Sequence, residues 1–235
     1  MEEMSATLYG IGIGPGDSEL LTLKAVRLIA EVPVLAWPAP LEGDGLARTI
    51  AAPHIPAGKT EIAIRMGFTV DRDGTEAAYD RAAEEIAAHL DAGRDVAVLC
   101  EGDPFFFGSF IYLFARLSPR FPVEVVPGVS SIMAAAADLQ APLCAWDDGV
   151  AVIPATRTEA EIEAALAASD AAVIMKVGRH LPKVRGVLQR LGLWDKARIV
   201  ERVGLPGRRA HDPATVTELP YFSLILVHRR GNAWL

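Results

Sequence analysis

The chain has 235 residues, of which 51% are hydrophobic, so it can bury a substantial core as one large domain or two smaller ones. Its 30 Asp and Glu outnumber its 23 Lys and Arg, and the resulting charge of −7 argues against a nucleic-acid-binding surface. Cys100 and Cys144 form no paired motif, which fits a reducing cytoplasm better than a disulfide framework or a zinc site. Residues 1–6 lack an apolar signal core and no apolar stretch has the length of a membrane span, so we expect a cytoplasmic protein without a membrane partner.

The first predicted unit is a strand, a glycine-rich turn and a helix. Residues 8–13 are apolar apart from their glycines, GIGPGD follows at 12–17, and residues 22–31 have helical spacing. The turn completes neither the G-x-G-x-x-G dinucleotide fingerprint nor a phosphate-binding loop, so both interpretations fail. It either brings bare backbone close to a ligand or only lets the helix pack on the strand.

A long segment rich in proline and glycine follows the second predicted strand, residues 32–37. Between residues 38 and 58 these residues break regular structure, which is typical of lids and binding loops. From residue 61 to residue 68, alternation predicts a strand with cations and apolar groups on opposite faces. The segment also has a local excess of cations: Arg48, Lys59, Arg65 and Arg72. The alternative is a solvated excursion with ordinary surface charges.

The centre of the chain is a buried strand, residues 96–99, that leads directly into Glu101-Gly102-Asp103-Pro104. Gly102 can adopt backbone angles closed to other residues, and Asp103 offers an acceptor to its own turn or to a ligand. In an open parallel α/β sheet, ligands bind beyond the carboxyl ends of the strands, where this loop would lie. A plain strand-to-helix connection with Asp103 as a cap is equally compatible with the sequence.

The remaining elements continue the alternation of helices and strands. Further helices are predicted at 76–92, 109–117, 132–139, 159–168 and 181–191, and strands at 123–126, 150–154, 171–177, 198–204 and 221–228. We expect two α/β domains, residues 1–127 and 128–235, with a ligand cleft between them. A third turn, PGVSS at 127–131, opens a helix with two serines that would cap it or bind a ligand.

Common catalytic signatures are absent from the sequence. There is no G-x-S-x-G or H-E-x-x-H motif, and the five histidines have no metal-ligand spacing. Three backbone-rich loops remain, GIGPGD, EGDP and PGVSS, and such loops suit a ligand held largely by main-chain groups. We expect no metal and assign no catalytic residue from the sequence.

These three ordered motifs resemble those of the tetrapyrrole (corrin/porphyrin) methylase family, and the resemblance covers essentially the whole chain. It implies a class III methyltransferase fold, a tetrapyrrole substrate, a homodimer, and S-adenosylmethionine bound between two α/β domains, with S-adenosylhomocysteine as product. The N-terminal domain would carry the glycine-rich loop, the insertion over the substrate and the central loop. The C-terminal domain would complete the donor site.

Motif positions carry the family's contacts over to this chain. By resemblance, the donor contacts are Pro15, Glu101, Gly102, Asp103, Phe106, Ser130, Ser131, Met175 and Gly204. The substrate contacts would be Gly14, Arg65 and Met66. Arg65 is the expected partner of a substrate carboxylate, because a guanidinium can bind a carboxylate through two parallel hydrogen bonds.

Within the family, the opening at residues 12–29 and EGDPFFFGS at 101–109 resemble the branch that methylates precorrin-2 at C20 in corrinoid synthesis. Branches acting on cobalt-precorrin-2, precorrin-3B, precorrin-4 or uroporphyrinogen III share the same loops and stay open. Two further alternatives are a relative that methylates RNA or protein and a nucleotide-binding module without catalysis. The acidic balance speaks against RNA, and the intact loops speak against a non-catalytic module.

Overall fold

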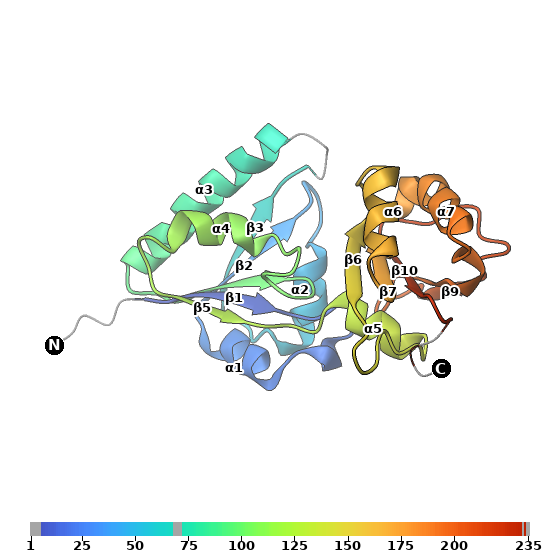
Figure 1. Cartoon of the computed structure of the whole chain (residues 1–235). Coiled ribbons are helices and arrows are strands. Elements are labelled where there is room, and N and C mark those ends of the chain that lie inside the picture. The colour runs from blue at the N-terminus through green and yellow to red at the C-terminus, as the bar shows by residue number, and fades with distance from the viewer. Residues whose placement is uncertain (1–5, 68–71, 232, 234–235) are drawn as a thin grey trace. The chain divides into compact units, whose positions relative to one another are not determined.

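The computed structural model describes residues 6–67, 72–231 and 233, and the chain divides into two compact units, residues 1–130 and 131–235 (Figure 1). Phe68, which the predicted strand at 61–68 included, lies outside the described residues, and so does the side chain of Arg72. Residues 1–5, which belong to the segment without an apolar signal core, lie outside the described residues as well. Among the described helices, none combines the length and the apolar character needed to cross a membrane.

Unit 1 is a parallel sheet with helices on both faces. Its elements are β1 (Leu8–Gly12), η1 (Ser18–Leu20), α1 (Leu23–Glu31), β2 (Val34–Ala39), α2 (Leu46–Ala51), η2 (Ala52–His54), β3 (Thr60–Arg65), α3 (Arg72–Asp91), β4 (Val96–Cys100), α4 (Phe110–Leu117) and β5 (Val123–Val126). The strand order is β3-β2-β4-β1-β5, and all neighbours run parallel. Figure 1 shows α3 and α4 over one face of this sheet and α1 over the other.

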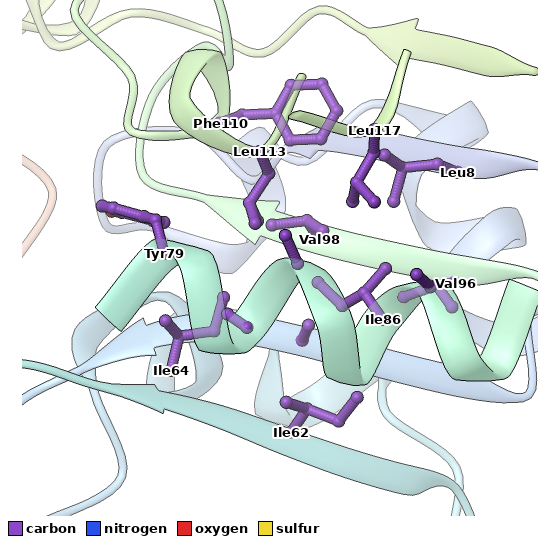
Figure 2. Packing of buried hydrophobic residues seen from close by; sticks show 14 of the residues in the cluster. Leu8, Ile62, Ile64, Tyr79, Ile86, Val96, Val98, Phe110, Leu113 and Leu117 are labelled. Carbon is purple, nitrogen blue, oxygen red and sulfur yellow. The ribbon is translucent and has the colours of Figure 1, made fainter. Parts of the chain in front are cut away.

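The main core of unit 1 lies between the sheet and the helices α3 and α4. Figure 2 shows Ile86 of α3 directed toward the β4 residues Val96 and Val98, with Leu113 of α4 nearby. Ile86 is completely buried, and Tyr79 of α3 stacks on Tyr112 of α4 with ring centroids 4.9 Å apart. Apolar side chains at helical spacing on α3 therefore fix the helix to the sheet.

The segment after β2 is more regular than the sequence predicts, because residues 46–54 form α2 and η2 instead of an open loop. Gly45, with φ 79°, starts the helix, and the indole nitrogen of Trp37 donates to the Asp44 carbonyl at 2.6 Å. One side of α2 is buried through Ala47, Ile50 and Ala51. The prediction of irregular structure was wrong here because this burial, which is tertiary, outweighs the turn-forming residues around the helix.

The predicted alternation of β3 is confirmed over the described residues. Ile62, Ile64 and Met66 are buried, with exposed fractions of 3–5%, whereas Glu61 and Arg65 are exposed. One face of the strand therefore belongs to the core, and the other carries the charged side chains.

Unit 2 has a mixed sheet of order β6-β7-β10-β8-β9. Its elements are α5 (Ser131–Asp138), β6 (Val150–Pro154), α6 (Glu159–Ala167), β7 (Ala171–Met175), η3 (Gly178–His180), α7 (Leu181–Arg190), η4 (Trp194–Lys196), β8 (Arg198–Glu201), β9 (Arg209–His211) and β10 (Ser223–His228). Strands β6 and β7 are parallel, while β10 runs antiparallel to both β7 and β8. Helices α6 and α7 bury their apolar sides in one core cluster of this sheet and α5 in another.

Strand β9 was not predicted from the sequence. It lies in the segment 205–213, which the sequence indicates as a loop, and it pairs antiparallel with β8. Two of its three residues are exposed, so the strand has no apolar pattern of its own. Its conformation comes from the backbone pairing with β8, which a local pattern does not reveal.

The first prediction concerns the core of unit 1. Replacing Ile86 by Ala should lower the free energy of unfolding by about 2–5 kcal/mol, because the side chain is fully buried and leaves a cavity. Urea denaturation followed by circular dichroism measures the change. Glu85→Ala, on the exposed side of the same helix, is the matched control and should stay within about 0.5 kcal/mol of the parent protein. Equal losses in the two variants would contradict this description of the core.

Candidate functional site

The three motif loops follow three neighbouring strands of unit 1. GIGPGD follows β1, EGDP follows β4 and PGVSS follows β5, and these strands lie side by side in the order β4-β1-β5. Because all three strands are parallel, their carboxyl ends meet at one edge of the sheet. The structure therefore brings the loops together at the place where open α/β sheets bind ligands.

Main-chain hydrogen bonds continue the contact beyond the strand ends. The amide of Ile13 donates to the Cys100 carbonyl at 3.0 Å. Gly14 and Gly102 exchange two hydrogen bonds of 2.8 and 3.3 Å, which form an isolated antiparallel bridge. Gly102 has φ 66°, a conformation that favours glycine. This angle confirms the prediction that Gly102 adopts a backbone conformation closed to most other residues.

Two glycines let the loops approach more closely than other residues would. A Cβ atom on Gly12 would lie 2.5 Å from the Gly128 nitrogen and 2.7 Å from the Gly102 carbonyl oxygen. A Cβ atom on Gly128 would overlap the same carbonyl oxygen. Sequence reasoning did not single out Gly12 or Gly128 in this role, because the spacing of glycines does not tell which backbone each one faces.

Asp103 ties two of these loops together through its carboxylate. One oxygen, Oδ1, accepts from the Phe105 amide at 2.9 Å, and the other, Oδ2, accepts from the Gly128 amide at 3.0 Å. The first bond caps the turn of its own loop, and the second reaches the loop after β5. The side chain therefore acts within the protein as a link between loops, beyond the turn cap that the sequence indicates.

Gly102 leaves open space at its Cα. A Cβ atom built there would meet no atom within 4 Å, in contrast to Gly12 and Gly128. Pro15 and Gly14, on the neighbouring loop, are buried. The main chain at Gly102 can thus be approached by a ligand, and the residues present fit a group that is held by backbone amides and carbonyls.

Glu101 is a partly buried carboxylate at the start of the central loop. Burial raises the pKa of Glu101, and backbone hydrogen bonds from its own amide and from Ala47 of α2 act in the opposite direction. Burial also raises the pKa of its neighbour Cys100, whose thiol is 1% exposed and stays protonated at neutral pH. The central loop therefore offers a carboxylate and no thiolate nucleophile.

The aromatic residues of the central loop lie at the surface of the chain. Phe105, Phe106 and Phe107 are 49%, 41% and 48% exposed, and the rings of Phe106 and Phe107 meet edge to face with centroids 5.1 Å apart. Of these, the resemblance assigns only Phe106 to the donor. The two neighbouring rings add apolar area that the sequence motif did not indicate.

Arg65 and Met66 have different surroundings although they are neighbours in sequence. The guanidinium of Arg65 donates through Nη1 to the carbonyls of Pro40 and Gly43, each at 3.0 Å, so it already organises the loop after β2. The side chain of Met66 packs in the core of unit 1 and is 5% exposed. A substrate could therefore reach Met66 only through its main chain, whereas Arg65 lies at the surface.

Two further cations of this segment, Lys59 and Arg48, have structural partners. Lys59 donates to the carbonyls of Ala30 and Val32 at the end of α1, and Arg48 pairs with Glu61 at 2.7 Å. The local basic excess predicted from the sequence is therefore largely used within unit 1 itself.

Met175 and Gly204 lie at one edge of the sheet of unit 2. Met175 ends β7 and Gly204 follows β8, and these strands run in the same direction on either side of β10. Lys176 and Arg202, which directly follow the two strands, adopt φ angles of 58° and 52°, which are unusual for long side chains. No sequence signal pointed to these two residues. Ser130 belongs to unit 1 and Ser131 begins α5 of unit 2.

Known proteins resemble this chain in sequence and in fold. Residues 7–220 match the family model described as tetrapyrrole (corrin/porphyrin) methylases. The chain is 42% identical over 230 residues to a protein of Sinorhizobium sp named precorrin-2 C(20)-methyltransferase, with 94% of each chain covered. It is also 42% identical to the cobalamin biosynthesis protein CobIJ of Mycobacterium tuberculosis, covering 94% of this chain and 46% of that protein. It therefore spans about half the length of that curated relative.

A solved structure supports the fold over the same extent. The crystal structure of uroporphyrin III C-methyl transferase from Thermus thermophilus in its native form has a TM-score of 0.69 and 26% sequence identity, covering 94% of this chain and 97% of the other. The motif loops, the order of the strands and the match to the family model over most of the chain lead to one conclusion. This chain belongs to the tetrapyrrole (corrin/porphyrin) methylases.

Proposed function

We propose that this protein is an S-adenosylmethionine-dependent C-methyltransferase of corrinoid (cobalamin) biosynthesis that methylates precorrin-2 at C20 to give precorrin-3A. The observation that carries the proposal is the similarity to the Sinorhizobium protein over 94% of both chains, which leaves no large segment of either unmatched. The three motif loops meet at one sheet edge, and this arrangement supports a small-molecule site at that edge.

The chemistry asks mainly for positioning. Methyl transfer from a sulfonium requires in-line approach of a nucleophile, and a reduced tetrapyrrole is electron-rich at its meso carbons. Holding two reactants in register can lower a barrier by up to ~7–11 kcal/mol. Rigid backbone loops at a sheet edge are suited to that task, because the interlocked glycines and the Asp103 link restrict their movement.

The donor would lie on the loops of unit 1, with unit 2 completing its site. In this proposal the residues 1–127 supply Pro15, Glu101, Gly102, Asp103 and Phe106, and the residues 128–235 supply Ser130, Ser131, Met175 and Gly204. Asp103 would act on the donor chiefly by fixing the loops, since both of its oxygens already accept backbone hydrogen bonds.

The acceptor would lie against the segment after β2. Precorrin-2 is a flat macrocycle fringed with carboxylates, so it needs apolar area together with cations. Arg65 supplies a cation whose Nη1 is bound to loop carbonyls, and among the described residues no hydrogen bond uses its Nη2, so this part of the guanidinium fork can bind a carboxylate. Gly14 and the main chain at Met66 would border the same ligand.

The resemblance to the family also leads us to propose a homodimer, and the two widely separated cysteines favour a reducing cytoplasm. Light scattering coupled to size-exclusion chromatography measures the mass of the assembly and so tests the homodimer directly. A mass of one chain at micromolar concentration would contradict it.

The decisive experiment is an incubation of the purified protein with S-adenosylmethionine and precorrin-2. A product heavier by one methyl group, together with an equal amount of S-adenosylhomocysteine, is the expected result. Cobalt-precorrin-2, precorrin-3B, precorrin-4 and uroporphyrinogen III serve as competing acceptors under the same conditions. Faster methylation of any of these would assign the chain to another branch of the family.

One prediction follows from the glycine contacts. Gly128→Ala should reduce the affinity for S-adenosylhomocysteine at least tenfold, because the added methyl group forces the loops after β4 and β5 apart. Isothermal titration calorimetry measures the affinity. The control is Gly186→Ala in α7, where a Cβ atom has only an ordinary contact of 3.7 Å with Arg190. If both variants bind like the parent protein, the glycine contacts do not support the donor site.

A further prediction concerns Arg65. Arg65→Ala should raise the KM for precorrin-2 about tenfold and leave the affinity for S-adenosylmethionine nearly unchanged, because its cation acts on the acceptor. Arg65→Lys should recover only part of the loss, since an ammonium lacks the planar fork. Steady-state kinetics with each substrate varied in turn separates the two effects. Equal impairment for both substrates would mean that Arg65 matters only through the loop at residues 40–43.

A further inference from the structure

The reaction proposed above leaves a proton to be removed. When the methyl group moves, the S–CH3 bond breaks, its electron pair stays on sulfur, and a new C–C bond forms at the tetrapyrrole carbon. That carbon then carries both the methyl group and its original hydrogen. The electron pair of the C–H bond must return to the conjugated system, and the proton must pass to a base. A group near the three loops must therefore accept this proton, and the sequence motifs did not indicate which residue does so.

The described ionisable side chains of the three motif loops are few. GIGPGD contains Asp17, EGDP contains Glu101 and Asp103, and PGVSS contains none. Asp17 is exposed and caps η1 by accepting from the Glu19 amide at 2.9 Å. Asp103 has both oxygens bound to backbone amides that link the loops. Glu101 is left as the carboxylate whose position is not explained by a link between motif loops or by a cap.

We propose that Glu101 accepts the proton that the tetrapyrrole carbon releases after methyl transfer. The residue directly follows β4, and its neighbour in the chain, Gly102, is the position where the loop is open to a ligand. On its other side, β4 pairs parallel with β2, so Glu101 leaves the sheet beside the segment after β2 that is proposed to border the acceptor. Glu101 thus stands between the donor loop and the acceptor segment.

The surroundings of Glu101 favour a base over a structural link. The backbone hydrogen bonds from its own amide and from Ala47 could be accepted equally well by the amide oxygen of a glutamine, which carries no charge. Burial raises the pKa of Glu101, and no cation is among the groups that lower it. An ionised glutamate at position 101 therefore stabilises the fold less than a glutamine would. A carboxylate with a raised pKa is also a better proton acceptor than an ordinary glutamate.

Neighbouring titratable groups do not compete for the role at neutral pH. Burial raises the pKa of Tyr79 on α3 to about 12, and it raises the pKa of the Cys100 thiol on β4, so both keep their protons. Arg48, which follows Ala47 on α2, pairs with Glu61 at 2.7 Å. Asp103, in the same loop, is a further charged neighbour, and its carboxylate links the loops through the amides of Phe105 and Gly128.

The test compares Glu101→Gln and Glu101→Asp with the parent protein. The matched control is Glu85→Gln, which replaces an exposed glutamate of α3. Glu101→Gln should bind S-adenosylhomocysteine within about threefold of the parent protein but form methylated precorrin-2 about 100-fold more slowly, a typical loss for a general base. Glu101→Asp should recover at least part of the rate. The control should keep the parent rate and affinity.

The pH dependence gives a second, independent readout. The rate of the parent protein should fall as the pH drops through the raised pKa of Glu101, and the rate of Glu101→Gln should not show this fall.

The melting temperature gives a third readout. An unfolded chain releases the Glu101 proton at a lower pH than the folded protein, so the charge destabilises the fold above the ordinary glutamate pKa. Glu101→Gln should therefore melt no lower than the parent protein at pH 7.5.

Three outcomes would overturn the proposal. If Glu101→Gln methylates at the parent rate, water or another group takes the proton. If it loses affinity for S-adenosylhomocysteine more than tenfold, Glu101 is a link within the donor site. If the parent protein methylates none of the tetrapyrroles, the proposed function on which this inference rests fails with it. The first two outcomes leave methylation of precorrin-2 by the parent protein intact, so the two failures are distinguishable.

Discussion

The close approach of three backbones at Gly12, Gly102 and Gly128 is the constraint on which the candidate site depends. It requires three parallel strands side by side, because only then do the loops leave the sheet at one edge. It also requires the absence of side chains at Gly12 and Gly128, where a Cβ atom would overlap the neighbouring backbone. The hydrogen bonds between Gly14 and Gly102 and the link from Asp103 to Gly128 then hold the loops together.

Two acidic residues of one short loop have different surroundings, and these separate their roles. Asp103 accepts a backbone hydrogen bond at each oxygen and thereby orders the loops. Glu101, two residues earlier, is partly buried, and burial shifts its pKa upward. Environments that differ over a few ångströms are how one site can contain both a fixed structural carboxylate and a carboxylate poised to take up a proton.

In each unit the segments with candidate site residues leave the sheet at one edge, although one sheet is parallel and the other is mixed. Unit 1 is fully parallel, so every strand delivers its following loop to the same edge. In unit 2, the antiparallel β10 lies between β7 and β8, and Met175 and the segment at Gly204 still share one edge because β7 and β8 run in the same direction. At this edge, Lys176 and Arg202 have left-handed backbone conformations, which cost energy and mark the edge as more than an ordinary set of turns.

The sequence by itself determined the alternation of helices and strands, the family and the three loops, because periodicity and turn residues are local and the motifs are ordered along the chain. Most predicted elements occur within a few residues of their expected bounds, including β4, α3 and β5. Local patterns missed α2, which is stabilised by burial of Ala47 and Ile50, and β9, which exists through pairing with β8.

Only the tertiary structure decided how the site residues are used. The sequence contained Gly12, Gly128 and Asp103 but not the contacts between them, because those contacts join segments from 25 to more than 100 residues apart. It likewise showed Arg65 as a cation and Met66 as an apolar residue, and only the packing placed one at the surface against loop carbonyls and the other in the core. Burial raises the pKa of Glu101, so its proton affinity follows from the folded arrangement and not from the motif that contains it.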